Sequence, residues 1–179
     1  RHGGNYDMGK HVLMTGINTD AKKYHVDINI SAWKAAKLLD AFHKFHPKIR
    51  GEYHRQIKDE INKSRELVRP DGSKRMFFDR IGDSLFKEAY ADIPQHTVAH
   101  RTKRAGLAAK KLMPDLQIVV EAHDALMFQC PEDEAMDRAR VMKQCMEEPV
   151  DFSKCSLSRG TIVIPSDCEF GSNYSDLKK

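Results

Sequence analysis

The decisive stretch of this sequence is Gln117-Ile118-Val119-Val120-Glu121-Ala122-His123-Asp124-Ala125-Leu126-Met127-Phe128-Gln129-Cys130, in which two apolar runs meet at a His-Asp pair. Each run has the length of a buried strand, so the stretch predicts a tight hairpin with Asp124 in the connection. A carboxylate at such a tip is well placed to hold a divalent cation. The residues alone also permit a plainer interpretation, in which Asp124 is a turn residue whose side chain bonds its own backbone.

The composition of the 179 residues is that of a globular chain, with 40% hydrophobic and 31% charged residues. The length suits one ordinary domain or a substantial part of a larger one. A net charge of +4 is compatible with a polyanionic partner, although a solvated surface also gives mild basicity. Because no apolar run reaches the length of a membrane span and no secretory signal opens the chain, we expect a cytoplasmic protein with no membrane partner.

The four cysteines, Cys130, Cys145, Cys155 and Cys168, show no Cys-x-x-Cys spacing, which argues against a zinc ribbon or a redox motif. We therefore expect free thiols in a reducing compartment. The chain opens on Arg1-His2-Gly3-Gly4-Asn5 without an initiating Met, which predicts a processed or divided polypeptide.

Local patterns predict several further elements. Ser31 is expected to cap an amphipathic helix over 32–45, which stops at Pro47. A second helix is expected over about 49–65, and a small hairpin follows with its turn at 70–73.

Two more helices are predicted in the second half of the chain, each with one apolar face. The first face comprises Val98, Thr102, Ala105, Ala109 and Leu112, and the second comprises Ala135, Ala139, Met142 and Met146. The tail over 161–174 reads as two strands broken by Pro165, which we expect to join the 116–130 hairpin in one antiparallel sheet.

Three stretches carry a resemblance to a known family: the His-Asp hairpin at 117–130, the segment His2-Gly3-Gly4-Asn5-Tyr6-Asp7-Met8-Gly9, and the segment Pro94-Gln95-His96-Thr97. In the same order along the chain, they resemble the palm hairpin, the fingers helix and the Pro-x-Gln-Gly-Thr segment of family A (DNA polymerase I-like) DNA polymerases. The fingers segment is similar to the phage version of that motif. The tail ends in a Gly-x-Asn-aromatic sequence at 171–174 that is similar to the family's C-terminal pattern, so the resemblance covers nearly the whole chain.

The resemblance implies a catalytic role for the hairpin tip and a nucleotide-binding role for the fingers segment. Asp124 matches a catalytic carboxylate that binds metal, and His123 would lie near the primer terminus and orient it by a hydrogen bond. Tyr6 matches the family Tyr beneath the nascent base pair, and His2 falls where the family has an aromatic residue beside the incoming sugar.

DNA-binding roles are implied for Gln95 and Arg75. Gln95 matches the family Gln that contacts the minor groove of the template-primer, where acceptors are similar for every base pair. The small hairpin over 66–78 resembles one in which the family has Gly-Arg-Arg, and Arg75 would touch template or triphosphate there, or serve as an ordinary surface residue.

His96 and His100 replace a family Gly and a family Asp, and they are also an i, i+4 pair. Such a pair places two imidazoles on one helix face, as in a zinc site. The sequence His-Thr-Val-Ala-His lacks the Glu of a metalloprotease and has no obvious third ligand. Two histidines that face solvent or DNA are therefore the preferred interpretation, with zinc as a minor alternative.

The family chemistry is nucleotidyl transfer with two Mg²⁺ ions about 3.5 to 4 Å apart, clamped by carboxylates from different strands. The family's other catalytic Asp lies upstream of the fingers helix, and nothing in this chain matches it. Ala125 also stands where the family commonly has Glu. We therefore expect the C-terminal part of a split polymerase, inactive alone, in which Mg²⁺ is shared with ligands outside this chain. Its partners would be DNA template-primer, deoxynucleoside triphosphates and a complementing N-terminal chain, in the host cytoplasm if the source is viral.

Two alternatives have different functions. The first is a non-catalytic polymerase-derived protein that binds DNA or a replication partner. The second is a metal-dependent hydrolase using Asp124 with His96 and His100, which is disfavoured because no nucleophile-activating constellation converges in sequence.

The fold class that follows is α+β, with an antiparallel palm sheet, covering helices and a helical fingers lobe, as part of a right-hand polymerase fold. Residues 1–80 would be the fingers-like portion with the small hairpin, and 81–179 the palm-like portion with the His-Asp hairpin. The palm sheet would lack one strand, which predicts an open edge, exposed apolar surface and association with the missing half.

Overall fold

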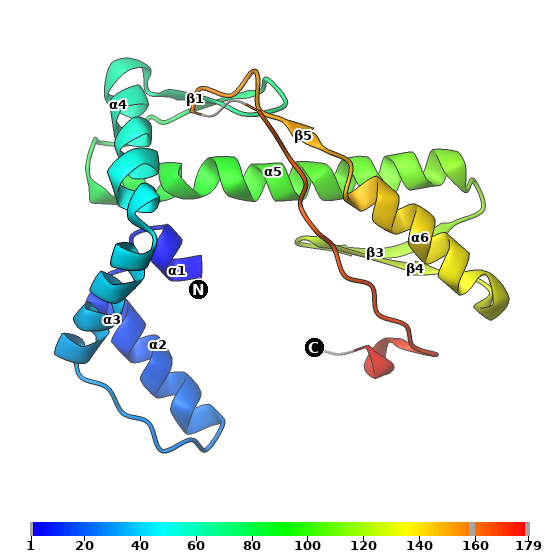
Figure 1. Cartoon of the computed structure of the whole chain (residues 1–179), viewed down its shortest axis with the longest axis horizontal. Helices are drawn as coiled ribbons and strands as arrows, with labels where there is room; N and C mark the ends of the chain where they lie inside the picture. The colour runs from blue at the N-terminus through cyan, green and yellow to red at the C-terminus, as the bar shows by residue number, and fades with distance from the viewer. Residues whose placement is uncertain (1, 158–159, 178–179) are drawn as a thin grey trace. The chain divides into compact units, whose positions relative to one another are not determined.

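The computed structural model describes residues 2–157 and 160–177, apart from the side chains of residues 2 and 3, as helices joined by short antiparallel strand pairs (Figure 1). The elements in chain order are α1 His2–Asn5, α2 Lys10–Lys23, α3 Ala32–Phe45, the π-helical η1 Ile49–His54, α4 Arg55–Ser64, β1 Glu66–Val68, β2 Lys74–Met76, α5 Asp83–Leu112, β3 Gln117–Ala122, β4 Ala125–Gln129, η2 Glu132–Glu134, α6 Ala135–Met146, β5 Val150–Asp151, β6 Thr161–Ile162 and η3 Tyr174–Asp176. This mixture of helices and small antiparallel sheets agrees with the predicted α+β class.

The chain forms two compact units. The first comprises residues 1–67 and 74–93, and the second comprises 68–73 and 94–179. The division lies at Pro94 within α5 and assigns the tip of the small hairpin to the second unit, whereas the sequence suggested a boundary after residue 80. The assignment of the two parts as fingers-like and palm-like stays a prediction.

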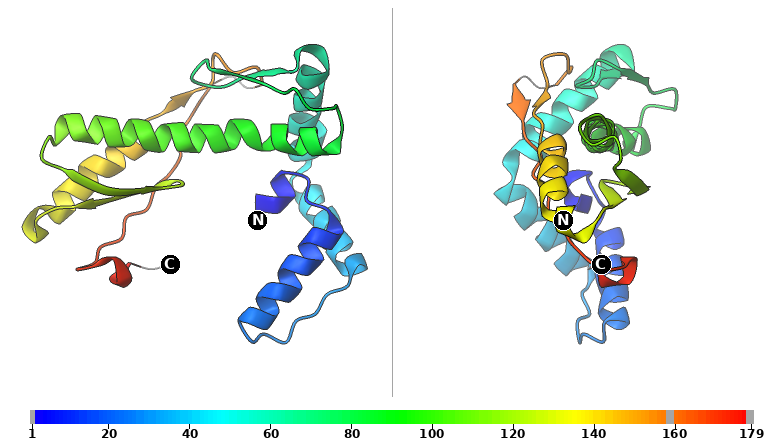
Figure 2. Two further views of the ribbon diagram at one scale, coloured as in Figure 1. Left: turned by 180° about the vertical axis from the view of Figure 1, so that it is seen from behind. Right: turned by 90° about the vertical axis from the view of Figure 1, so that its right-hand side faces the viewer.

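Helices α2 and α3 pack together in the first unit (Figure 2). The predicted cap is present, because the Ser31 side chain accepts a hydrogen bond of 3.3 Å from the Lys34 N–H at the start of α3. The loop that precedes α3 is held to α2 by Asn18, whose side chain bonds both the N–H and the carbonyl of Ile30 at 2.8 and 3.1 Å. The predicted helix over 32–45 is confirmed with its bounds.

The segment that resembles the fingers helix is interrupted in the structure, whereas the resemblance implied one helix there. Helix α1 ends at Asn5 and α2 begins at Lys10, because Asp7 takes a left-handed φ of 58° that no helix can continue. Gly4 serves close packing, since an added Cβ would lie only 2.7 Å from Cε1 of Phe42. The Phe42 ring therefore packs directly against the backbone of α1 at Gly4.

His43 on α3 is buried with both ring nitrogens unpartnered. Burial lowers the pKa of His43 from its ordinary value of 6.5, and the nearby charge of Arg50 adds to the effect. The unfolded chain therefore binds the proton more readily than the folded chain. As a result, the free energy of unfolding is highest above the unfolded pKa and falls as the pH drops below 6.5.

We expect His43→Leu to stabilise the protein by about 1 to 3 kcal/mol, the usual cost of an unpaired buried polar group, and more at about pH 5 than at about pH 7.5. Chemical denaturation at both pH values measures this. The exposed His11 gives the matched control, because His11→Leu should change neither value. A destabilised His43→Leu protein would show that the imidazole has a partner in solution.

Helix α5 contains Pro94, which has no N–H to give to the carbonyl of Tyr90 one turn earlier. That carbonyl accepts instead a hydrogen bond of 2.7 Å from the Tyr53 hydroxyl of η1. Tyr90 is almost fully buried and its ring stacks on His54 at 3.8 Å between centroids. Burial and the charges of Asp7 and Asp83 raise the pKa of Tyr90 to about 12.

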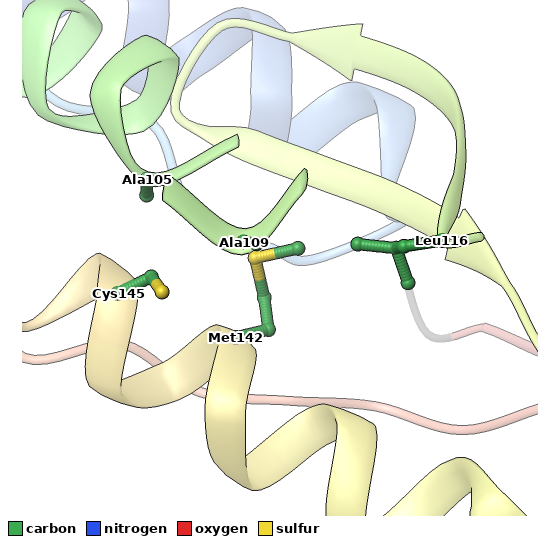
Figure 3. Packing of buried hydrophobic residues seen from close by; sticks show 5 residues of the cluster. All are labelled: Ala105, Ala109, Leu116, Met142 and Cys145. Atoms are coloured by element: carbon green, nitrogen blue, oxygen red, sulfur yellow. The ribbon is translucent and has the colours of Figure 1, made fainter. Parts of the chain in front are cut away.

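The core of the second unit lies where the C-terminal half of α5, the β3–β4 hairpin and α6 meet (Figures 2 and 3). Its buried members are Ala105, Ala109, Leu116, Met142 and Cys145. The small alanines of α5 let Met142 of α6 extend toward Ala109, as Figure 3 shows. Of the predicted α6 stripe, Ala139 and Met142 are buried, whereas Ala135 and Met146 are partly exposed.

The strands form three separate two-stranded sheets within the described residues: β1–β2, β3–β4 and β5–β6. The expectation that the tail strands join the 116–130 hairpin was therefore wrong. The tail contributes Thr161–Ile162, which pairs with Val150–Asp151, and Pro165 lacks the N–H that a longer ladder needs. The apolar runs are also less buried than predicted, because every residue of β3 is exposed.

Two smaller expectations concern the thiols and the membrane. All four cysteines are free, as predicted. The helices in the described ranges are too short or too polar to cross a bilayer, including the long but highly charged α5.

Candidate active site

The β3–β4 hairpin has the predicted connection at its tip. Its antiparallel pairing runs from Gln117 opposite Gln129 to Ala122 opposite Ala125, so His123 and Asp124 form a two-residue loop. The register shifts between Ile118 and Val120, which is a bulge that adds twist to the ribbon. The prediction that Asp124 lies in a tight turn between two strands is confirmed.

The backbone of the tip is held in an uncommon conformation. His123 has a φ of 54°, a left-handed value that costs a residue with a Cβ on the order of 1 kcal/mol. Both His123 and Asp124 are exposed, and neither side chain forms a hydrogen bond with any described residue. The plainer interpretation required a bond from the Asp124 carboxylate to its own turn, and that bond is not formed.

The hairpin is fixed to α5 by apolar contacts beneath its exposed tip. A Cβ added to Gly106 would lie 3.4 Å from side-chain carbons of both Ile118 and Leu126, so the absence of a side chain lets the ribbon lie close to the helix. Leu116, at the entry to β3, is fully buried against the core. The carboxylate of Asp124 is thus an exposed group on an anchored support.

Asp124 supplies one oxygen ligand of the kind that Mg²⁺ prefers. Within the described residues, it belongs to no group of three His, Cys, Asp or Glu side chains close enough to share an ion. Asp124 is therefore a single exposed carboxylate, without further ligands beside it among the described residues.

Tyr6 follows α1 in the first unit and is partly buried. The turn that carries it is fixed by Asp7, whose carboxylate accepts hydrogen bonds of 3.1 and 2.7 Å from the Arg50 guanidinium. Burial alone would raise the pKa of Asp7, but the hydrogen bond and charge of Arg50 outweigh it and lower that pKa. The His2 backbone lies in α1, and its side chain is outside the described part of the chain.

The two residues predicted to contact DNA have different surroundings. Gln95 is exposed on α5, where its amide is available to a partner. Arg75 is engaged by two carboxylates of α5, those of Glu88 and of the buried Asp92, the latter at 2.9 Å, and it lies over the Phe77 ring. Any contact of Arg75 with DNA must therefore compete with two ion pairs.

A second cluster lies in the same unit as the His-Asp hairpin, and the sequence indicated only its two histidines, not its carboxylate. Asp71 lies at the tip of the small hairpin. Its Oδ2 is 3.1 Å from Nε2 of His96, within hydrogen-bond distance, and 3.8 Å from Nε2 of His100. In linear sequence Asp71 appears only as a turn residue, and no spacing rule connects it to a helix beginning twelve positions later. These three side chains form the one described group that could hold a metal ion.

The surroundings of this cluster lower the pKa of its carboxylate and of one of its two imidazoles. Burial alone would raise the pKa of Asp71, yet hydrogen bonds from Ser73 and His96 lower it to about 2. Burial lowers the pKa of His100, against the attraction of Asp71.

No family model matches the chain. Over 60 residues it is 32% identical to a DNA polymerase of Bacillus phage SP01, a match that covers 34% of this chain and 6% of that protein. The fold over 89% of this chain is similar to 28% of a solved chain, the POL domain of Pol1 from M. smegmatis in complex with DNA primer-template and dNTP, with a TM-score of 0.65 and 17% identity. The chain resembles part of a DNA polymerase I-like polymerase.

The resemblance to DNA polymerase I-like polymerases that the sequence motifs suggested is thereby confirmed, by a curated relative and by a solved polymerase domain. The chain spans a small fraction of both proteins. At 17% identity, the likeness to the solved polymerase domain concerns the fold. The roles of individual side chains therefore depend on the geometry described above.

Proposed function

We propose that this chain is the C-terminal part of a template-directed DNA polymerase, which adds deoxynucleotides to a primer 3′ end by two-metal nucleotidyl transfer. The observation that carries this proposal is Asp124, an unpaired carboxylate at the tip of an anchored hairpin in a polymerase-like fold. Asp124 binds metal in this proposal, and His123 beside it orients the primer terminus. The metal centre, when complete, neutralises charge on the reacting phosphate and activates the primer hydroxyl.

The remaining site residues bind nucleotide and DNA in the same proposal. Tyr6 and His2 contact the incoming nucleotide, Gln95 contacts the minor groove, and Arg75 reaches template or triphosphate by exchanging one of its carboxylate partners. The solved polymerase domain that resembles this chain was determined with DNA primer-template and dNTP, which supports these partners. In this assignment residues 1–80 are fingers-like and 81–179 palm-like.

The other metal ligands come from residues outside this chain's 179, either on a complementing N-terminal chain or elsewhere in a longer polypeptide. Two features support an added strand beside β3–β4. The sheet has only two strands among the described residues. Its apolar side chains are also exposed to solvent, with Val119 55% exposed and Val120 40% exposed. An unpaired ladder with apolar surface favours pairing with another segment.

We expect primer extension with Mg²⁺ only when this chain is mixed with a second polypeptide. That polypeptide is the part of a DNA polymerase I-like polymerase that precedes the fingers helix, including its palm and fingers segments. The chain alone and the added polypeptide alone are the controls, because each lacks one carboxylate of the metal centre.

A second candidate is a non-catalytic DNA-binding protein. The basic composition favours it, and its signature is binding to primer-template that weakens steeply with salt and needs no Mg²⁺. If every mixture fails to extend a primer while this binding remains, the second function replaces the first.

A further inference from the structure

Asp71, His96 and His100 converge from two elements of the second unit. Asp71 lies in the turn that connects β1 and β2, and the two histidines lie one turn apart on α5. One ligand atom from each, a carboxylate oxygen or a ring nitrogen, lies within 4.8 Å of the other two. The pair of histidines, for which the sequence offered no third ligand, therefore has one in Asp71.

The three side chains are oriented before any ion binds. Asp71 Oδ1 accepts hydrogen bonds of 3.0 and 2.7 Å from the N–H and hydroxyl of Ser73, which leaves Oδ2 to face the imidazoles. The two rings stack at 5.6 Å between centroids with an angle of 11° between their planes. Both present Nε2 to the carboxylate. Outer hydrogen bonds of this kind are what orient the ligands of metal sites.

The spacing of the ligand atoms is close to what a tetrahedral zinc ion needs. Zinc lies about 2.0 to 2.1 Å from nitrogen and oxygen ligands, which places two ligand atoms of a tetrahedron about 3.3 Å apart. Asp71 Oδ2 lies 3.1 Å from Nε2 of His96 and 3.8 Å from Nε2 of His100. The ligand atoms of the two histidines lie within 4.8 Å of each other, so side-chain rotation has to bring the rings together around an ion, and all three side chains are partly exposed.

We propose that Asp71, His96 and His100 bind a zinc ion, with a fourth position open to water or to another ligand. Two imidazoles and one carboxylate favour zinc over magnesium, which prefers oxygen ligands alone. Arg101, the residue after His100 on α5, is held by the Glu148 carboxylate and the Cys145 carbonyl, both at 2.7 Å. The ion ties the tip of the small hairpin to α5, and this site is independent of the polymerase proposal.

The competing interpretation is a hydrogen-bonded His-Asp cluster that needs no metal. The two differ in what zinc does to the protein. Bound zinc stabilises the folded state in proportion to its affinity, so it raises the melting temperature by several degrees when present at a large excess over its dissociation constant. A cluster that binds no ion gives no such rise.

The test is a calorimetric titration of the full 179-residue chain with Zn²⁺, repeated with Asp71→Asn, His96→Gln and His100→Gln. We expect one equivalent to bind, and each substitution to weaken binding by at least about tenfold, because even partners of ligands cost that much when changed. Exposed residues elsewhere give the matched controls, since His11→Gln and Asp133→Asn should leave zinc affinity unchanged. An excess of Mg²⁺ should not displace the zinc.

Cobalt(II) provides a second readout, because its visible absorption reports a tetrahedral site with nitrogen and oxygen ligands and is distinct from that of thiolate ligands. Circular dichroism of each variant shows whether it is folded. Three results overturn the proposal: no zinc binding by the folded wild-type chain, binding that survives Asp71→Asn unchanged, or a thiolate spectrum that places the ion on cysteines.

Discussion

Asp124→Asn should lower primer extension by about 10³-fold or more in the mixture of this chain with the upstream polymerase polypeptide. The substitution removes one negative oxygen ligand from the metal centre and leaves a neutral amide. Interactions of that kind are worth several kcal/mol in the transition state, and each 1.4 kcal/mol is a factor of about ten in rate.

The loss should be chemical rather than structural. Asp124 is exposed and its side chain bonds no described residue, so the free energy of unfolding should change by less than about 0.5 kcal/mol. Asp133→Asn is the matched control, because Asp133 is also an exposed acid of the second unit but lies outside the hairpin. Binding of primer-template in the absence of Mg²⁺ should be the same for both variants and the wild type.

A variant of the neighbouring residue separates geometry from chemistry. His123→Gly keeps the left-handed backbone without its steric cost, so the hairpin should be retained. It removes the imidazole that we propose orients the primer. If Asp124→Asn retains full activity in the mixture, the hairpin is not the metal-binding element and the polymerase proposal loses its central residue.

Leu116→Ala should destabilise the second unit by about 2 to 5 kcal/mol, the usual cost of removing a fully buried leucine side chain. Leu116 is enclosed by Ala109 and Met142, and neither can move far enough to fill the space, because each is carried by a helix. The hairpin enters the core through this residue, so the anchoring of Asp124 depends on it.

Urea denaturation followed by circular dichroism measures the effect, and the transition of the second unit should move while that of the first stays in place. Leu107→Ala is the control on the same helix, because Leu107 is 68% exposed and its truncation should cost less than about 0.5 kcal/mol. Equal losses for the two leucines would mean that Leu107 is covered in solution, as it would be at an interface.

Elements encoded by neighbouring residues could be predicted from the sequence. The cap at Ser31 and the helix after it depend on contacts within a few positions, and both were found with their bounds. The tight connection at His123 and Asp124 was also predicted, because two apolar runs that meet at a short polar link are local signals. The break after Asn5 was not, since a left-handed Asp7 leaves no mark in the apolar spacing.

Pairing between distant segments could not be predicted in the same way. Strand partners are chosen by packing across the fold, so the tail strands were assigned to the wrong sheet. The same limit applies to the candidate sites. Asp71 is 25 residues from His96, and Arg75 is 17 from Asp92, and no periodicity reports either contact.

The proline in α5 has a consequence for the order in which the first unit folds. Pro94 leaves the carbonyl of Tyr90 without its partner in the helix, and the Tyr53 hydroxyl takes it from a position 37 residues away in sequence. A bond that would have formed with the helix itself has become one that forms only after a long loop has closed. This turn of α5 is therefore completed late in folding, because its last hydrogen bond forms only when η1 packs against the helix.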